Sequence, residues 1–146
     1  MSVLFFWVGD NYQKDMKDEG KTYNLNQNSE LMIRLEPGDH IWAFTRREDK
    51  TYVIAADLVV TRTEHNPPGY KYGRYRAWGD PKTSRYFDVR IGPDAESTVK
   101  SLSFYPPRTK VNALGQLFQG FNGVRLLSST DEEKLRTFSS GLRTLR

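Results

Sequence analysis

Cationic and aromatic side chains alternate along residues 70–90, and this combination could bind nucleic acid. The segment carries six Lys or Arg residues against two acidic ones, Asp80 and Asp88. Those expected to contact phosphates are Lys71, Arg74, Arg76, Lys82 and Arg85. The rings interleaved with them are Tyr70, Tyr72, Tyr75, Trp78, Tyr86 and Phe87. Binding an unpaired or extruded base requires such side chains, because cations bind phosphates and flat rings stack on bases.

The same residues could instead form a hairpin whose rings face the core and whose arginines face water. The period of two in a strand, however, would place Tyr72, Arg74, Arg76 and Trp78 on one face of the sheet. A purely buried face does not suit two arginines. The pattern therefore favours an exposed face that binds nucleic acid.

Three tryptophans, Trp7, Trp42 and Trp78, fall on expected strands or at their ends. In a barrel they could line one pocket, where an aromatic cage would hold a base or a methylated group by stacking and cation–π contact. For each tryptophan taken alone, a place in the barrel core is the more common outcome. The cage and the core are thus two alternatives for these rings.

Short polar side chains beside the strand ends could recognise the edge of a bound base. Asp10 and Asn11 follow directly after the first strand and could supply the required acceptors and donors. Asp57 interrupts a strongly apolar strand, so we expect it at a bulge, in an ion pair or facing the pocket. Asp39, in the turn Pro37-Gly38-Asp39, is expected to hold that turn.

Motifs for catalysis or metal binding are few. His40 and His65 have no cysteine or second histidine at ligand spacing, so no metal site and no cofactor are expected. Pro93-Asp94 followed by Glu132-Glu133-Lys134 resembles a nuclease pattern, but that chemistry needs the second part on a strand beside the aspartate to share Mg²⁺. Here it falls in the first turn of an expected helix, where capping explains it. We therefore predict no catalytic residue.

The scaffold for these side chains is predicted to consist mainly of strands. Aromatic and β-branched residues bounded by Gly, Pro, Asp or Asn predict strands within 4–11, 36–44 and 52–60. Further strands are predicted over 72–78, 85–91 and 124–127. The Asn-rich segment 23–29 predicts a turn, and a long loop is expected from His65. A helix capped by Ser129, with Glu132 three residues later, is expected after the last strand.

Bulk properties agree with one globular domain over residues 1–146. The chain is 37% hydrophobic and 13% aromatic, which predicts a soluble, folded protein with a real core. No apolar run approaches the roughly 20 residues of a membrane span, and the N-terminus does not resemble a signal peptide. The chain has no cysteine, which fits a cytoplasmic location, and its net charge of +4 permits nucleic-acid binding.

Three motifs of the N-terminal half resemble the EVE branch of the PUA-like superfamily, which is related to the YTH readers of N6-methyladenine. They are Phe6-Trp7-Val8-Gly9-Asp10-Asn11, Pro37-Gly38-Asp39-His40-Ile41-Trp42 and Ile54-Ala55-Ala56-Asp57-Leu58-Val59. The C-terminal half adds Phe118-Gln119-Gly120, Val124-Arg125-Leu126-Leu127 and the last helix, which look like the closing strand and helix of such domains. The resemblance implies an α+β fold: a mixed β-barrel with flanking helices.

Members of this branch flip a modified base into an aromatic pocket, often as the N-terminal part of modification-dependent restriction enzymes. The resemblance thus implies a DNA-binding reader of methylated DNA, with modified cytosine or N6-methyladenine as its base. The expected partner is modified double-stranded DNA, with no membrane, and any nuclease activity would lie in a fused or associated domain. The expected base pocket comprises Trp7, Asp10, Asn11, Trp42, Asp57 and Trp78. The alternative is a stand-alone PUA-like protein that binds RNA or a nucleotide.

Overall fold

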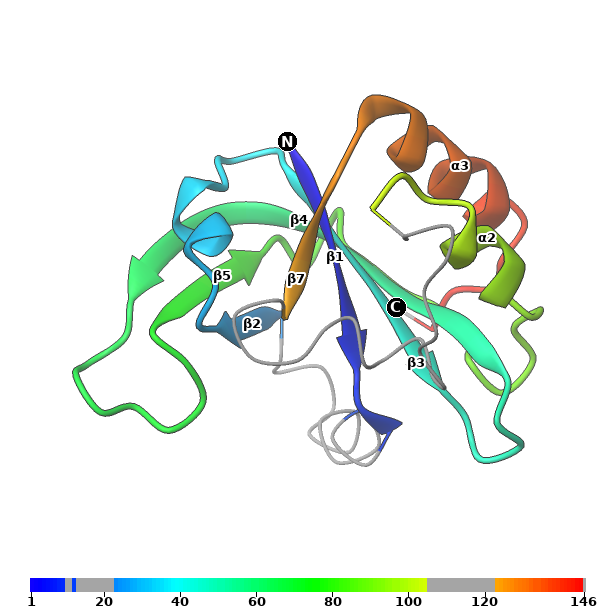
Figure 1. Ribbon diagram of the computed structural model, residues 1–146, viewed down its shortest axis with the longest axis horizontal. Helices are drawn as coiled ribbons and strands as arrows, with labels where there is room; N and C mark the ends of the chain where they lie inside the picture. Colours follow the sequence, from blue (N-terminus) through cyan, green and yellow to red (C-terminus); the bar gives the residue numbers. More distant parts are fainter. Residues whose placement is uncertain (10–11, 13–22, 105–122, 146) are drawn as a thin grey trace.

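A mixed sheet curled into a half-barrel forms the body of the protein (Figure 1). The computed structural model describes residues 1–9, 12, 23–104 and 123–145. Within these residues the strand order is β2-β5-β4-β3-β1-β7, and β6 pairs with β4 off this path. The strands are β1 (Ser2–Trp7), β2 (Asn24–Gln27), β3 (His40–Arg46), β4 (Tyr52–His65), β5 (Tyr75–Gly79), β6 (Arg85–Tyr86) and β7 (Val124–Leu127). β1 runs parallel to β3, and the other pairs are antiparallel.

Strand β4 joins the two halves of this sheet. Its first part pairs with β3 and β6, and its second part, from Val60 to His65, pairs with β5. The register shifts between Val60 and Arg62, where the pairing with β5 begins. Such an irregularity bends a strand and increases its twist. The single strand can therefore follow the curve of the half-barrel from one end to the other.

The sheet has a core on each face, as the alternation of its side chains requires. On β1, Val3 and Phe5 belong to an inner core, whereas Leu4 belongs to an outer core. The 3₁₀ helix η1 (Glu30–Arg34) packs on the inner face through Met32, which is fully buried. Helices α2 (Glu96–Lys100) and α3 (Ser129–Ser139) pack on the outer face through Val99 and Leu135.

The helices cover only one half of the outer face. In Figure 1, α2 and α3 lie together on one side of the molecule, whereas β2, β5 and the second half of β4 lie on the other side. The outer core that the helices complete involves β1, β3 and the first part of β4, through Leu4, Trp42 and Ile54. No described helix packs on the outer face of β2 and β5. That half of the sheet is available to carry polar side chains.

The α+β class, the barrel-like sheet and the packing of the last helix on it were all predicted from the sequence and are confirmed. Strand 124–127 is also confirmed, but the Asn-rich segment was wrongly predicted as a turn, since Asn24–Gln27 pairs with β5. The strand predicted to end at Val60 continues to His65 because β5 supplies new partners. The strand predicted over 85–91 is limited to Arg85–Tyr86.

The cap of α3 lies one residue earlier than predicted. The Ser128 hydroxyl accepts from the backbone N–H of Asp131 at 3.0 Å, and the Asp131 carboxylate accepts from the backbone N–H of Ser128 at 3.0 Å. This pair forms the reciprocal capping box that was expected from Ser129 and Glu132. Asp131 also accepts from Ser103, and these hydrogen bonds hold the pKa of its buried carboxyl below the ordinary value despite desolvation.

Candidate functional site

Alternating cations and rings occupy the half of the outer face that the helices leave uncovered. The register places Arg62 opposite Trp78 and Glu64 opposite Arg76, and Ala77 between them faces the inner core. The guanidinium of Arg62 lies 4.9 Å from the Trp78 ring centroid, and that of Arg76 lies 5.3 Å from it. Arg76 also lies 5.2 Å from the ring of Tyr70. We call Arg62, Glu64, Tyr70, Arg76 and Trp78 the outer patch.

Hydrogen bonds fix the orientation of Arg76 within the outer patch. Its Nε donates to Asn26 Oδ1 at 2.8 Å, and one terminal nitrogen donates to the hydroxyl of Tyr70 at 2.7 Å. Asn66 donates to the same Asn26 oxygen at 2.9 Å. The guanidinium is therefore held between two rings by strand β2 and by the loop that precedes β5. An ordered guanidinium of this kind can stack on a base as well as bind phosphate.

Glu64 orients the other end of the outer patch. Its carboxylate accepts from the indole N–H of Trp78 at 2.9 Å and from Arg62 at 3.0 Å. The Trp78 hydrogen bond, followed by that of Arg62, holds the pKa of Glu64 below its ordinary value. Glu64 is the one acidic residue of segment 61–79, which contains four Lys or Arg residues. The patch is thus preorganised, and the segment that carries most of it is positively charged.

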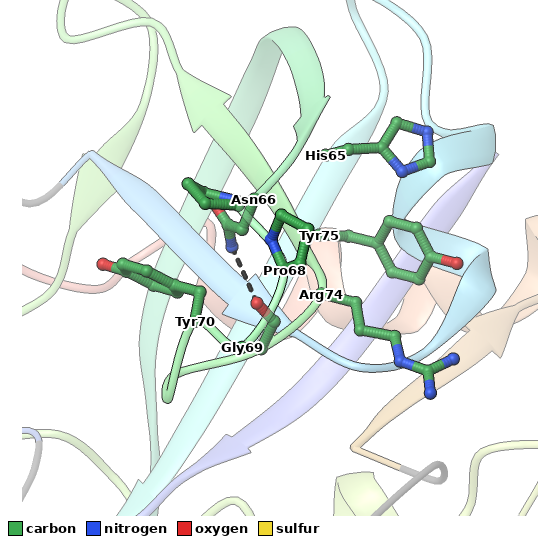
Figure 2. A pocket seen from close by; sticks show the side chains of 9 residues that line it. His65, Asn66, Pro68, Gly69, Tyr70, Arg74 and Tyr75 are labelled. Carbon is green, nitrogen blue, oxygen red and sulfur yellow. Dashed lines mark hydrogen bonds between the residues drawn. The ribbon is translucent and has the colours of Figure 1, made fainter.

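The loop between β4 and β5 encloses a hollow of about 380 Å³ (Figure 2). We call it the loop hollow, and its lining consists of His65, Asn66, Pro67, Pro68, Gly69, Tyr70, Gly73, Arg74 and Tyr75. Figure 2 shows His65, Arg74 and Tyr75 extending to one side and Tyr70 to the other. The rings of His65 and Tyr75 meet edge to face, with centroids 5.2 Å apart. Small-molecule sites begin at about 300 Å³, so the loop hollow has room for one small ring system.

The shape of this loop depends on two glycines and on one asparagine. Gly69 and Gly73 have φ values of 79° and 142°, which other residues rarely adopt. A Cβ on Gly73 would also lie 2.8 Å from the backbone of Gln27 in β2. Asn66 donates across the loop to the carbonyl of Gly73 at 2.9 Å. Close packing against β2 thus sets the position of the loop hollow beside the outer patch.

The three tryptophans do not share a pocket. Trp42 is fully buried in the outer core beneath the helices, and its Nε1 has no hydrogen-bond partner among the described residues. Trp7 packs against the inner core, on the opposite face of the sheet. Trp78 lies in the outer patch, on the part of the sheet formed by β4 and β5. The expectation of one cage built from these three rings is therefore wrong, because the sheet separates Trp7 from Trp42.

Trp7 instead belongs to a group of rings inside the half-barrel. Its ring centroid lies 5.1 Å from that of Tyr12 and 6.2 Å from that of Tyr86, and Tyr86 lies 5.2 Å from Tyr23. The sequence analysis did not anticipate this inner group, since its members come from four separate segments. The predicted base-edge residues Asp10 and Asn11, like the motif 118–120, lie outside the described residues.

Asp57 is buried in an ion pair, which is one of the three alternatives expected for it. Its two oxygens accept from His40 Nδ1 at 2.6 Å and from Arg85 at 3.0 Å. The hydrogen bond to Asp57 raises the pKa of His40, and desolvation opposes this effect. Asp57 is 3% exposed and both oxygens are bonded, so it does not face a pocket. Asp39 holds its turn as expected, accepting from the backbone of Glu36 at 2.8 Å.

The five predicted phosphate-binding residues are spread over several elements. Lys71, Arg74 and Arg76 lie in the loop before β5 or on that strand. Lys82 is exposed in the turn at the other end of β5, and Arg85 follows on β6. Tyr72, Arg74, Arg76 and Trp78 were expected on one face of a strand. Because β5 begins at Tyr75, Arg76 and Trp78 lie on this strand, whereas Tyr72 and Arg74 lie in the loop before it.

The sequence analysis did not identify Arg62 and Glu64 as site residues, because it ended the strand at Val60 and expected a loop to follow. Their alternation in Thr61-Arg62-Thr63-Glu64 is the signal that could have revealed them, since it continues the period of the strand.

No family model and no curated protein matches the chain. The resemblance to the EVE branch therefore stays a prediction from the motifs themselves. No helix among the described residues is long and apolar enough to cross a membrane.

Proposed function

We propose that this protein binds nucleic acid through the outer patch and the adjoining loop hollow. The observation that supports this proposal best is the stack of Arg62, Trp78, Arg76 and Tyr70 on the half of the outer face that no described helix covers. Guanidinium groups bind phosphates and also stack on bases, so this arrangement provides both contacts that single-stranded segments require. The basic charge of segment 61–79 supplies the attraction that does not depend on sequence.

The loop hollow is our candidate for the position of one unpaired or extruded base. Tyr70 belongs both to its lining and to the outer patch, so a base in the hollow would lie next to bound phosphates. His65, Asn66 and Arg74 are the polar side chains of the lining that could meet the edge of a base. This candidate replaces the cage of three tryptophans.

Two versions of this function differ in their ligand. The resemblance to the EVE branch favours a reader of modified cytosine or N6-methyladenine in DNA, acting as the specificity module of a modification-dependent restriction system. The alternative is a stand-alone protein that binds RNA or a nucleotide. We keep both, because the loop hollow could accept a flipped DNA base or a base of single-stranded RNA.

A binding panel on the full chain distinguishes these versions. Fluorescence anisotropy would compare single-stranded and duplex DNA and RNA, each with and without methylated cytosine or N6-methyladenine. A reader is expected to bind the modified duplex more tightly than its unmodified copy, whereas the alternative predicts a preference for RNA or for a free nucleotide. Absence of binding to every member at low salt would refute the proposed function.

The Arg74→Gln/Arg76→Gln double variant tests the surface itself. Because phosphate contacts carry no sequence information, we expect weaker binding to all ligands and a flatter salt dependence. Lys100→Gln/Lys134→Gln is the matched control, since it removes the same charge from α2 and α3 rather than from the outer patch and the loop hollow. Equal losses in the two double variants would assign binding to general charge and would contradict the proposed site.

A further inference from the structure

A polar junction lies where the first part of β4 meets β3 and β6. Asp57 is its centre, with His40 on one oxygen and Arg85 on the other. Both donors bond the same carboxylate, so the His40 ring and the Arg85 guanidinium lie close to each other. Asp57 is buried, whereas the side chains of His40 and Arg85 are 24% and 38% exposed. The cations of the junction therefore face solvent and its acid does not.

Helix α3 adds a third cation to this junction. Glu132 accepts from the hydroxyl of Ser2 at 2.7 Å and pairs with Arg136 one turn along the helix. Ser2 is the neighbour of His40 in the parallel pairing of β1 with β3. Through Ser2, Glu132 lies beside the strand position of His40, and Arg136 is held by Glu132. The side chain of Arg136 is 59% exposed.

Several donors of these cations are unused among the described residues. His40 bonds Asp57 through Nδ1, and no described group bonds its Nε2. Arg85 and Arg136 each donate through one terminal nitrogen, to Asp57 and Glu132. The carboxylates of Asp57 and Glu132 each already have two partners. Arg85, Arg136 and, when it is protonated, His40 are partly exposed cations with spare N–H groups, and together they suit an anion that has several oxygens, such as phosphate.

The polar junction and the outer patch lie on the same face of β4. Leu58 and Val60 face the inner core, so Asp57 faces outward. Beyond the register shift, Thr63 pairs with the inward-facing Ala77, which places Arg62 and Glu64 outward. Glu64 lies seven positions after Asp57, or about 23 Å along an extended strand. One strand thus links both sets of cations along one face.

We propose that the polar junction is a second phosphate-binding site, so that a nucleic-acid strand bound at the outer patch extends along β4 to α3. This inference rests on the proposed function and specifies its path. It predicts that Arg85, Arg136 and the Nε2 of His40 contact the phosphate backbone of an oligonucleotide only when the oligonucleotide is long. Short oligonucleotides would occupy the outer patch and would not reach these groups.

A length series of oligothymidylates, from about 4 to 16 nucleotides, tests this path on the full chain. Arg136→Gln is expected to weaken binding of the longest oligonucleotides by about three- to tenfold. It should also lower their salt slope by about 0.7, the value for one contact to a single-stranded phosphate. Binding of the shortest oligonucleotides should be unchanged. Lys100→Gln is the matched control, because Lys100 forms the same i,i+4 type of pair with Glu96 on α2.

The pH dependence provides a second measurement. The charged groups around His40 are Asp57, Arg85, Glu132 and Arg136. Asp39 is the neighbour of His40 in sequence, but its carboxylate is bonded to the amino group of Met1 and to the backbone of Glu36. Protonated His40 should bind phosphate better, so the advantage of long over short oligonucleotides should decrease from pH 6 to pH 8. His40→Gln should remove this pH effect, and melting curves would check that it is folded.

The outcomes separate the two proposals. Normal binding of short oligonucleotides, with Arg136→Gln equal to Lys100→Gln at every length, would overturn the path and leave the outer patch in place. A pH effect that persists in His40→Gln would also count against the second site. Lack of binding by the unaltered protein at any length would instead overturn the proposed function.

Discussion

Replacement of Arg76 by lysine separates charge from geometry in the outer patch. Arg76 contacts two rings, at 5.2 and 5.3 Å, and donates two side-chain hydrogen bonds, at 2.8 and 2.7 Å. An ammonium group keeps the charge, but its compact shape cannot maintain all four contacts at once. Exposed cation–π contacts are worth about 0.5–1 kcal/mol each, so Arg76→Lys should lower the free energy of unfolding by about 1–2 kcal/mol.

The effect on binding should be larger than this conservative change suggests. Base stacking is worth about 1–3 kcal/mol, and part of it should be lost when the flat guanidinium is removed. We expect the affinity of Arg76→Lys for single-stranded oligonucleotides to fall by roughly five- to thirtyfold, with an unchanged salt slope. Arg76→Gln should lose a similar factor and should also lower the slope by about 0.7.

Anisotropy titrations between 50 and 200 mM salt would measure both quantities, and urea unfolding would confirm that each variant is folded. If Arg76→Lys bound as tightly as the unaltered protein, the ordered stack would be irrelevant to binding. If Arg76→Gln retained the full salt slope, Arg76 would not contact phosphate. Either result would refute the role that we assign to the geometry of this residue.

Three further predictions concern stability and protonation. Trp42→Ala should lower the free energy of unfolding by about 3–5 kcal/mol in urea titrations, because the ring is fully buried, and a small loss would contradict its place in the core. The raised pKa of His40 should add stability that is complete below pH 6.5, where the unfolded histidine is also protonated, and is lost as the pH rises through the folded pKa. Asp57→Asn should remove this pH dependence and lower the His40 pKa, as NMR titration would show. Gly73→Ala should destabilise the protein by more than about 1 kcal/mol, because its φ of 142° and the nearby backbone of Gln27 leave no room for a Cβ, and an unchanged melting temperature would contradict this packing.

The sequence predicted those elements whose signals are local. Val124–Leu127 is bounded by Gly123 and Ser128 and was predicted with its correct limits. The helix after it was predicted from its cap, with an error of one residue in the position of that cap. In both cases, residues close in sequence determine the structure.

Errors occurred where partners distant in sequence determine the structure. Asn24–Gln27 lacks β propensity and is a strand because β5 binds it, through pairs such as Asn26 with Arg76. The place of Trp42 under the helices depends on which face of β3 receives α2 and α3, and no single segment carries that information. The basic-aromatic character of residues 70–78 was visible in the sequence, whereas its completion by Arg62 and Glu64 required the register of β4 with β5.

The uneven cover of the sheet connects the fold with the proposed function. Helices α2 and α3 bury Leu4, Trp42 and Ile54 on one half of the outer face, and this apolar half requires them. On the other half, Arg76 donates to Asn26 and Trp78 donates to Glu64, so these polar groups need no such cover. Strand β4 runs through both halves, and its outward residues change from Ile54 to Arg62 along the way. A strand that is apolar under the helices and cationic beyond them can stabilise the domain at one end and bind an anionic polymer at the other.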